Sequence, residues 1–234
     1  MKGTSIKKIL ILVTILAVPG FLYYLLTEKG KNRYKPLPYF GPKAVASTFH
    51  SVRGKQIPDT VYHEIADFKL INQNSDTLNW KSFENKILIL NLFYSNDNPG
   101  TKLANKVIKD FEKQYGKNTV IRFVSVSIDP KRDRPEVLSK YAAQLNAKAG
   151  KWDLLTGDST QVYNLANKQL LVDALQKTDN GKTGFIYNNL FLLIDPQHHI
   201  RGYYEAANQE ALAKLDDEIK VLIVEELRNN KDGR

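Results

Sequence analysis

The segment Ile87–Thr101, ILILNLFYSNDNPGT, joins a continuous apolar run to a polar loop made of turn-forming residues. The apolar half has the length and composition of a strand that is buried on both faces. The residues that follow, Thr101–Tyr115, repeat apolar side chains four positions apart, as at Leu103 and Val107, which is the spacing of an amphipathic helix. The segment therefore predicts a buried strand, a loop and a helix, the unit from which α/β folds are built.

Similar patterns continue towards the C-terminus. The β-branched run Thr119–Asp129 is typical of a second strand. The sequence Asp133-Arg-Pro-Glu136 predicts a helix start, with Asp133 as N-cap and Glu136 placed as in a capping box. The other expected elements are an entry strand and hairpin within Val61–Trp80, a short strand Trp152–Leu155, a short helix Gln161–Lys168, an antiparallel pair Phe185–Asp195 and Ile200–Ala206, and a last helix from about Asn208 to Leu227. Together they predict an α/β, thioredoxin-like fold, in which helices flank a mixed sheet.

The composition is that of an ordinary globular protein. The chain has 234 residues, of which 42% are hydrophobic and 25% charged, and this length favours one domain. It has no cysteine, which excludes structural disulfides, thiol catalysis and cysteine metal sites. Of the net charge of +9, residues 1–35 hold +6, as seven Lys and Arg against one Glu, which leaves +3 for the rest. Without a basic and aromatic stripe, nucleic acid binding is not expected.

The N-terminus predicts a membrane anchor. Residues 1–8 form a basic tail, and residues 9–26, ILILVTILAVPGFLYYLL, are uncharged and about as long as a bilayer-crossing helix. A cleaved signal peptide is the alternative, but the small-residue cleavage pattern is poor and no cysteine follows for lipidation. Residues 27–60, which begin rich in Lys, Pro and Gly, are expected to be a tether, and residues 61–234 the globular domain. A short basic tail before one anchor favours export of the domain.

Three segments resemble one protein family. Val124–Asp158, VSVSIDPKRDRPEVLSKYAAQLNAKAGKWDLLTGD, is similar to a signature segment of the Sco/SenC proteins, which are membrane-anchored and thioredoxin-like. Tyr62–Ser75, YHEIADFKLINQNS, and Leu190–Ala206, LFLLIDPQHHIRGYYEA, resemble their counterparts in that family. The likeness runs collinearly from about Leu37 to Leu227, so it implies the fold of the family.

The resemblance implies copper delivery or thiol redox work during assembly of cytochrome c oxidase. In the family this work is carried by a C-x-x-x-C pair after the first buried strand and by a histidine before the D-P turn. Two thiolates and an imidazole suit copper, and a thiol pair can exchange electrons. The resemblance places Asn96 and Gly100 at the cysteine positions and Tyr187 at the histidine. None of the three is a soft donor, so the loop is predicted to be a former metal and redox site rebuilt as a turn.

The first hypothesis is a non-catalytic, membrane-anchored factor that binds respiratory oxidase assembly components, in cytochrome oxidase assembly or copper homeostasis, with no metal or other cofactor. It would be a single-pass protein of the bacterial inner membrane, spanning it with residues 9–26 and holding its domain in the periplasm. The alternative is a copper chaperone of the Sco type whose ligands are unidentified or come in part from a partner. A third hypothesis is a different enzyme built on the old pocket.

Further polar side chains have both functional and structural interpretations. Asp129, Asp133 and Asp195 could form a carboxylate metal cluster, but a strand-end turn, a helix cap and a hairpin account for them. His198 and His199 could bind a metal, although adjacent histidines in a turn point apart.

Four other residues stand near the expected loop or among the remaining metal donors. His50 and His63 have no ligand partner at helical spacing. Asp97 could bind a hard cation but more simply stabilises the turn or the next helix. Tyr94 could line the vacated pocket with Tyr187, or pack in the core.

Overall fold

Seven strands form the central sheet, in the order β11-β10-β5-β6-β7-β3-β4. They are β3 (Leu70–Asn72), β4 (Thr77–Leu78), β5 (Ile87–Phe93), β6 (Ile121–Ser127), β7 (Trp152–Thr156), β10 (Leu190–Ile194) and β11 (Ile200–Glu205). β5, β6 and β7 are parallel, and the strands on either side of them are antiparallel. The sheet is therefore mixed, as the alternation of strand and helix patterns predicts.

The computed structural model describes residues 3–25, 36–52, 54–96, 99–179 and 182–232. These residues fall into two units, Met1–Lys35 and Pro36–Arg234, and each is described by itself. In the first unit α1 (Gly3–Tyr24) is a helix with Pro19 inside it. Over the described residues, none of the helices is both long and apolar enough to count as a membrane span.

Helices cover both faces of the sheet. α2 (Pro99–Tyr115), α3 (Pro135–Leu145) and α5 (Gln209–Asp232) pack on one face, and η2 (Trp80–Phe83), α4 (Ser159–Asn164) and η3 (Leu165–Gln169) on the other. Because side chains alternate along a strand, β5 sends Ile87 and Ile89 to the first core and Leu88 and Leu90 to the second. This explains why the run from Ile87 shows no polar alternation.

The expected strand Phe185–Asp195 is in fact two strands. β9 (Lys182–Tyr187) pairs with β8 (Ala174–Asp179), and only β10 joins the central sheet. The chain turns between them, where the amide of Leu190 donates to the carbonyl of Asn188 at 2.9 Å. The prediction of one continuous strand was wrong, because the side chains of two successive asparagines favour a turn over a ladder.

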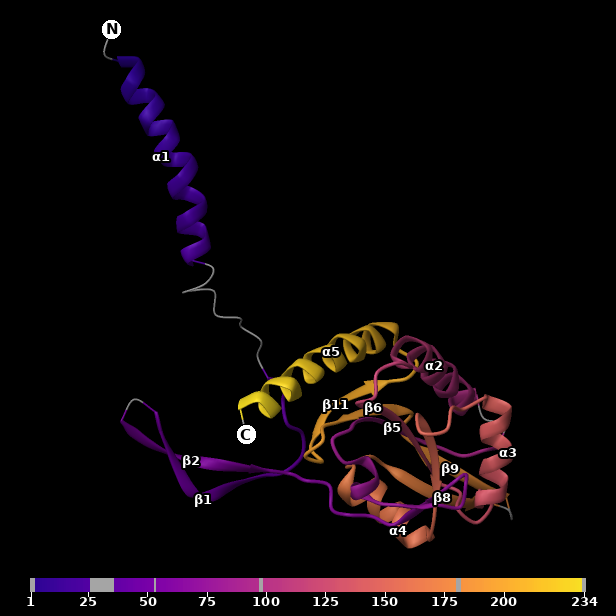
Figure 1. Ribbon diagram of the computed structural model, residues 1–234. Coiled ribbons are helices and arrows are strands. Elements are labelled where there is room, and N and C mark those ends of the chain that lie inside the picture. The colour runs from indigo at the N-terminus through magenta and orange to yellow at the C-terminus, as the bar shows by residue number, and fades with distance from the viewer. Residues whose placement is uncertain (1–2, 26–35, 53, 97–98, 180–181, 233–234) are drawn as a thin grey trace. The chain divides into compact units, whose positions relative to one another are not determined.

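A second hairpin lies in the segment expected to be a tether. β1 (Lys43–Val52) and β2 (Lys55–Tyr62) are antiparallel and form a two-stranded sheet of their own. Figure 1 shows this hairpin projecting from the central sheet. Gly54 adopts φ +79° at the turn, a conformation that favours glycine. Regular structure thus begins well before Val61.

Candidate functional site

The loop after β5 is held by a buried carboxylate. Asp133 has no exposed surface, and its oxygens accept hydrogen bonds from the Ser95 amide at 2.9 Å, from the Ser95 hydroxyl and from the Ser127 hydroxyl. The expectation that Asp133 caps α3 was wrong, since the N-cap is Arg134 and no side chain bonds there. A buried carboxylate needs its donors close by, and the two serines supply them without the helix.

The structure brings together two of the three positions that the resemblance predicts as ligand positions. Gly100 lies in the first turn of α2 and Tyr187 at the end of β9, and the neighbouring Thr101 hydroxyl is 3.2 Å from the Tyr187 hydroxyl. The carbonyl of Gly100 also accepts a hydrogen bond from Asn189 at 3.2 Å. The start of α2 is therefore fixed to the end of β9.

The third position, Asn96, lies between β5 and α2, at the start of the same loop. It lines an open hollow of about 540 Å³ together with Ser95, Lys102 and Lys106. The remaining lining residues are Asn105, Lys109, Tyr141, Gln144, Leu145 and Asn146, so the hollow has three lysines and no carboxylate. Asp97 lies outside the described residues.

The donor set at these positions does not suit copper. Asn96 offers an amide and Gly100 no side chain, while burial raises the pKa of the Tyr187 phenol above its ordinary value. Tyr94 packs against Phe185 and Tyr187, with ring centroids 4.9 and 6.0 Å apart, so it contributes packing. In the part of the chain that the structure describes, no three His, Cys, Asp or Glu side chains group so as to hold a metal ion.

The histidines point to separate partners. His198 stacks on Trp80 at 4.1 Å, whereas His199 meets Tyr39 edge-on at 5.1 Å, as expected for neighbours in a turn. His63 bonds the carbonyl of Gln169 at 2.7 Å, and a side-chain contact of 2.6 Å joins the ring of His50 to Asp59. Among the described residues, each histidine therefore has a partner of its own, and none belongs to a group of three possible metal donors.

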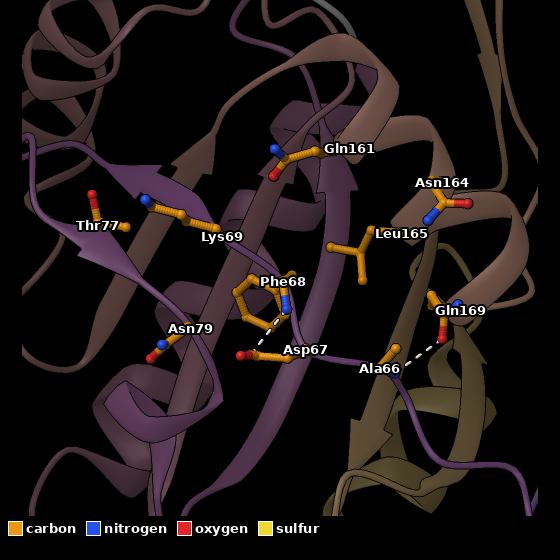
Figure 2. Close-up of a pocket in the computed structure, with 10 residues that line it drawn as sticks. All are labelled: Ala66, Asp67, Phe68, Lys69, Thr77, Asn79, Gln161, Asn164, Leu165 and Gln169. Carbon is orange, nitrogen blue, oxygen red and sulfur yellow. Dashed lines mark hydrogen bonds between the residues drawn. The ribbon is translucent and has the colours of Figure 1, made fainter.

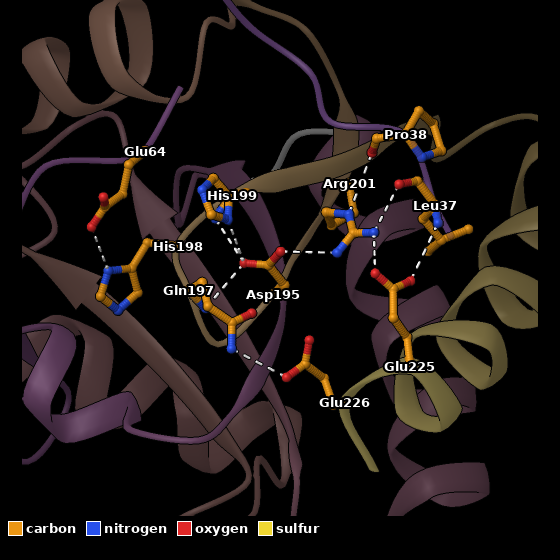
Figure 3. Close-up of polar contacts among 10 residues, drawn as sticks. All are labelled: Leu37, Pro38, Glu64, Asp195, Gln197, His198, His199, Arg201, Glu225 and Glu226. Atoms are coloured by element: carbon orange, nitrogen blue, oxygen red, sulfur yellow. Dashed lines mark hydrogen bonds and ion pairs between the residues drawn. The ribbon is translucent and has the colours of Figure 1, made fainter. Parts of the chain in front are cut away.

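Arg201 forms a buried ionic network that the sequence patterns did not indicate (Figure 3). It is 1% exposed, and its guanidinium donates to Asp195 at 3.0 Å and to Glu225 at 2.6 Å. It also donates to the carbonyl of Leu37 at 2.7 Å and lies over the Tyr39 ring at 4.2 Å. Asp195 is therefore a structural ion-pair partner of Arg201. Its role differs from that of Asp129, which lies in a turn, and from that of Asp133, which holds the loop at Ser95.

A further hollow of about 400 Å³ lies beside α4 and η3 (Figure 2). Figure 2 shows Phe68 between Asp67 and Leu165, with Gln169 bonded to the Ala66 amide at 2.9 Å. Its lining carries amides, one carboxylate and one ammonium, and no nucleophile paired with a base. The hollow at Asn96 is the one that adjoins the predicted site.

Comparison with known proteins identifies the family of this chain. A model of the SCO1/SenC family matches residues 58–220. The chain belongs to the SCO1/SenC family. It is 24% identical over 169 residues to a SCO1 protein homolog of Bacillus subtilis, which covers 71% of this chain and 86% of the relative. A SCO2-like protein of Rickettsia prowazekii is 25% identical over 217 residues, which is 91% of this chain and 96% of that protein.

Solved structures of SCO1/SenC proteins share the fold. A SCO1/SenC family lipoprotein from Bacillus anthracis matches with a TM-score of 0.60 at 20% identity, over 68% of this chain and 95% of that one. Copper-bound ScoI of Bradyrhizobium japonicum matches with a TM-score of 0.56 at 20% identity, over 65% and 98%. The thioredoxin-like fold predicted from the sequence is confirmed by these likenesses.

Proposed function

We propose that this SCO1/SenC protein is a non-catalytic, partner-binding factor in respiratory cytochrome oxidase assembly or copper homeostasis. A solved relative, BsSco, is a member of the Sco family of cytochrome c oxidase assembly proteins, which supports this field of action. The observation that carries the proposal is the contact of Thr101 with Tyr187 beside Gly100. Here the Thr101 and Tyr187 hydroxyls meet and Asn189 donates to the Gly100 carbonyl. The chain has no thiol to place there.

Copper is the group that the family implies, and the residues present do not fit it. A neutral phenol with a raised pKa and a carboxamide are poor ligands for Cu(I), which prefers thiolate, thioether and imidazole. With no cysteine in the chain, dithiol chemistry has no reactant. The proposal therefore includes no metal, no cofactor and no enzymatic step.

The partner is proposed to bind the face that carries Asn96, Lys102 and Lys106. This face adjoins the loop held by Asp133, and its hollow is lined by three lysines and by uncharged polar groups. A surface of that charge favours a partner with acidic side chains and speeds the encounter. Respiratory oxidase assembly components are the proposed partners.

We place the protein in the bacterial inner membrane, with residues 9–26 as a single span and the domain in the periplasm. The uncharged run and its lysine flanks support this assignment. The protein should remain in the membrane fraction after washing with high salt and carbonate, and keep its N-terminus. A soluble form that begins near residue 20 would instead identify a cleaved signal.

The proposed binding face can be tested by affinity capture from membranes. Full-length tagged protein should recover a specific partner, and Lys106→Glu should reduce the recovery because it reverses a charge at the hollow. Lys168→Glu makes the same change on η3, over the opposite sheet face, and should leave recovery unchanged. Capture of no specific protein, or equal loss with both variants, would contradict the proposal.

A copper chaperone with partner-supplied ligands is the second candidate. It is favoured by the relatives whose structures hold copper, such as ScoI of Bradyrhizobium japonicum. Copper titration of the protein with and without the captured partner separates the two functions. Copper bound only in the complex would support the second candidate.

A further inference from the structure

The β1–β2 hairpin is an isolated sheet with apolar side chains in solvent. Val45 is 77% exposed, Phe49 59% and Ile57 41%. Over the described residues, neither β1 nor β2 pairs with a strand of the central sheet. A two-stranded hairpin alone in water is marginally stable, so a surface that covers these side chains would stabilise it.

The apolar side chains of this hairpin occupy both of its faces. Directly paired residues share a face, so Phe49 lies with Pro58 on one side. Ile57 and Val52 lie on the opposite side, because side chains alternate along each strand. A protein laid on one face would leave the other in water, whereas a lipid interface surrounds both.

The base of the hairpin is fixed to the domain. Tyr62, at the end of β2, stacks on Tyr39 with ring centroids 4.1 Å apart. The guanidinium of Arg201 lies over the Tyr39 ring at 4.2 Å. The amide of Phe40 also donates to the carbonyl of Ile200 at 2.9 Å. The hairpin therefore extends from a rigid support.

The charge around the hairpin matches an anionic surface. Residues 43–62 contain Lys43, Arg53 and Lys55 against one carboxylate, Asp59, which leaves a net charge of +2. Lys and Arg side chains near an anionic membrane are attracted to its headgroups. We propose that the β1–β2 hairpin rests on the anionic lipid surface, inserting Phe49 and its apolar neighbours at the headgroup level. This inference relies on the proposed anchor at residues 9–26.

The chain lengths permit this contact. Eleven residues lead from Leu26 to Leu37, and fully extended they reach about 35–40 Å. Leu37 is held in the domain by Arg201 and Glu225, so this reach is an upper limit that the chain length alone sets. The eight-residue strand β2 is about 27 Å long, a length of the same order as that reach.

A single introduced cysteine tests the contact, since the chain has none of its own. Full-length Ser51→Cys, labelled with an environment-sensitive dye, is placed in nanodiscs that contain phosphatidylglycerol, with Lys168→Cys as the matched control. We expect a blue shift and about twofold stronger quenching by spin-labelled lipids at position 51 than at position 168. The difference should shrink in pure phosphatidylcholine and disappear when Phe49→Ser is added.

Three results would overturn the proposal. The first is a label at position 51 that is as exposed to water in anionic nanodiscs as the label at position 168. Shielding that appears in detergent and grows with protein concentration would assign the hairpin to contact between two copies. If the chain does not enter nanodiscs, the anchor is refuted, and flotation of the labelled chain with phosphatidylglycerol vesicles then tests the hairpin separately. Failure of that flotation would also refute the hairpin contact.

Discussion

The hydroxyl groups of Thr101 and Tyr187 lie 3.2 Å apart and join the first turn of α2 to the end of β9. Thr101 is almost completely buried, so this contact satisfies a polar group that has left water. The phenol at the position that the resemblance predicts for the family's histidine is therefore already engaged with a protein group.

Removing either hydroxyl should weaken the fold at this point. Tyr187→Phe should cost about 1 kcal/mol, because the buried Thr101 hydroxyl loses its partner. Thr101→Val should cost a similar amount, and the double variant little more than one of them. Urea unfolding followed by tryptophan fluorescence measures all three. Costs that simply add in the double variant would show that the hydroxyls do not interact.

Asp133 should be more important for stability than an ordinary helix cap. Asp133→Ala leaves the Ser95 amide and the Ser127 hydroxyl without their buried acceptor and should cost about 3 kcal/mol. Asp158→Ala is the control, since Asp158 is the exposed N-cap of α4 and its loss should cost about 1 kcal/mol. Equal costs in thermal unfolding would contradict the assigned role.

Arg201 should fix the start of the domain. Arg201→Met leaves Asp195 and Glu225 unpaired and should destabilise the fold by about 3–5 kcal/mol. Because Leu37 also loses the hydrogen bond from Arg201 to its carbonyl, limited proteolysis should cut near it faster than in the parent protein. Lys220→Met, which removes an exposed ion pair with Asp216, should change neither the stability of the fold nor the rate of cleavage near Leu37. Unchanged cleavage in Arg201→Met would refute the clamp.

Glu226 should make stability depend on pH. Burial raises the pKa of the Glu226 carboxyl, and Asp195 and Glu225 add to the rise, against the opposing effects of Gln197 and Arg201. A raised folded pKa means that the stability contributed by the protonated form is complete at low pH and is lost as pH rises through that pKa. Glu226→Gln stays neutral, so it should exceed the parent in stability at pH 7. Unfolding at pH 7 should show this gain, and at pH 4 it should disappear.

The central strands and helices were predictable because their patterns are strong. The run from Ile87 is apolar on both faces, and α2 repeats its buried residues at helical spacing, so both appear with nearly correct bounds. The β8–β9 hairpin was missed because β8 is mostly polar and both strands lie outside the central sheet. The sequence Asn180-Gly181 between them is a hairpin signal that could have found it.

The site could be predicted only in part. The replacement of thiols and imidazole by Asn96, Gly100 and Tyr187 follows from the resemblance, whereas the role of Asp133 does not. Its pairing with Ser95 joins residues 38 positions apart, which no local pattern encodes. For the same reason the contact of Arg201 with Leu37, across 164 positions, had no signal in the sequence.

Restoring the family's donors should create a copper site. Asn96→Cys, Gly100→Cys and Tyr187→His together supply two thiolates and an imidazole, and Gly100 lies in helical backbone that a cysteine can adopt. Each single substitution should gain little, since one donor without the others binds weakly. Competition against a chromogenic Cu(I) chelator measures the gain. A folded triple variant that binds no copper would show that the three positions are not the family's ligand positions.

The most direct test is Cu(I) titration of the unmodified full-length protein in the same chelator competition. We expect that the protein withdraws no Cu(I) from the chelator, because Asn96, Gly100 and Tyr187 offer no soft donor and the histidines have separate partners. Stoichiometric, tight Cu(I) binding by the unmodified chain would contradict it.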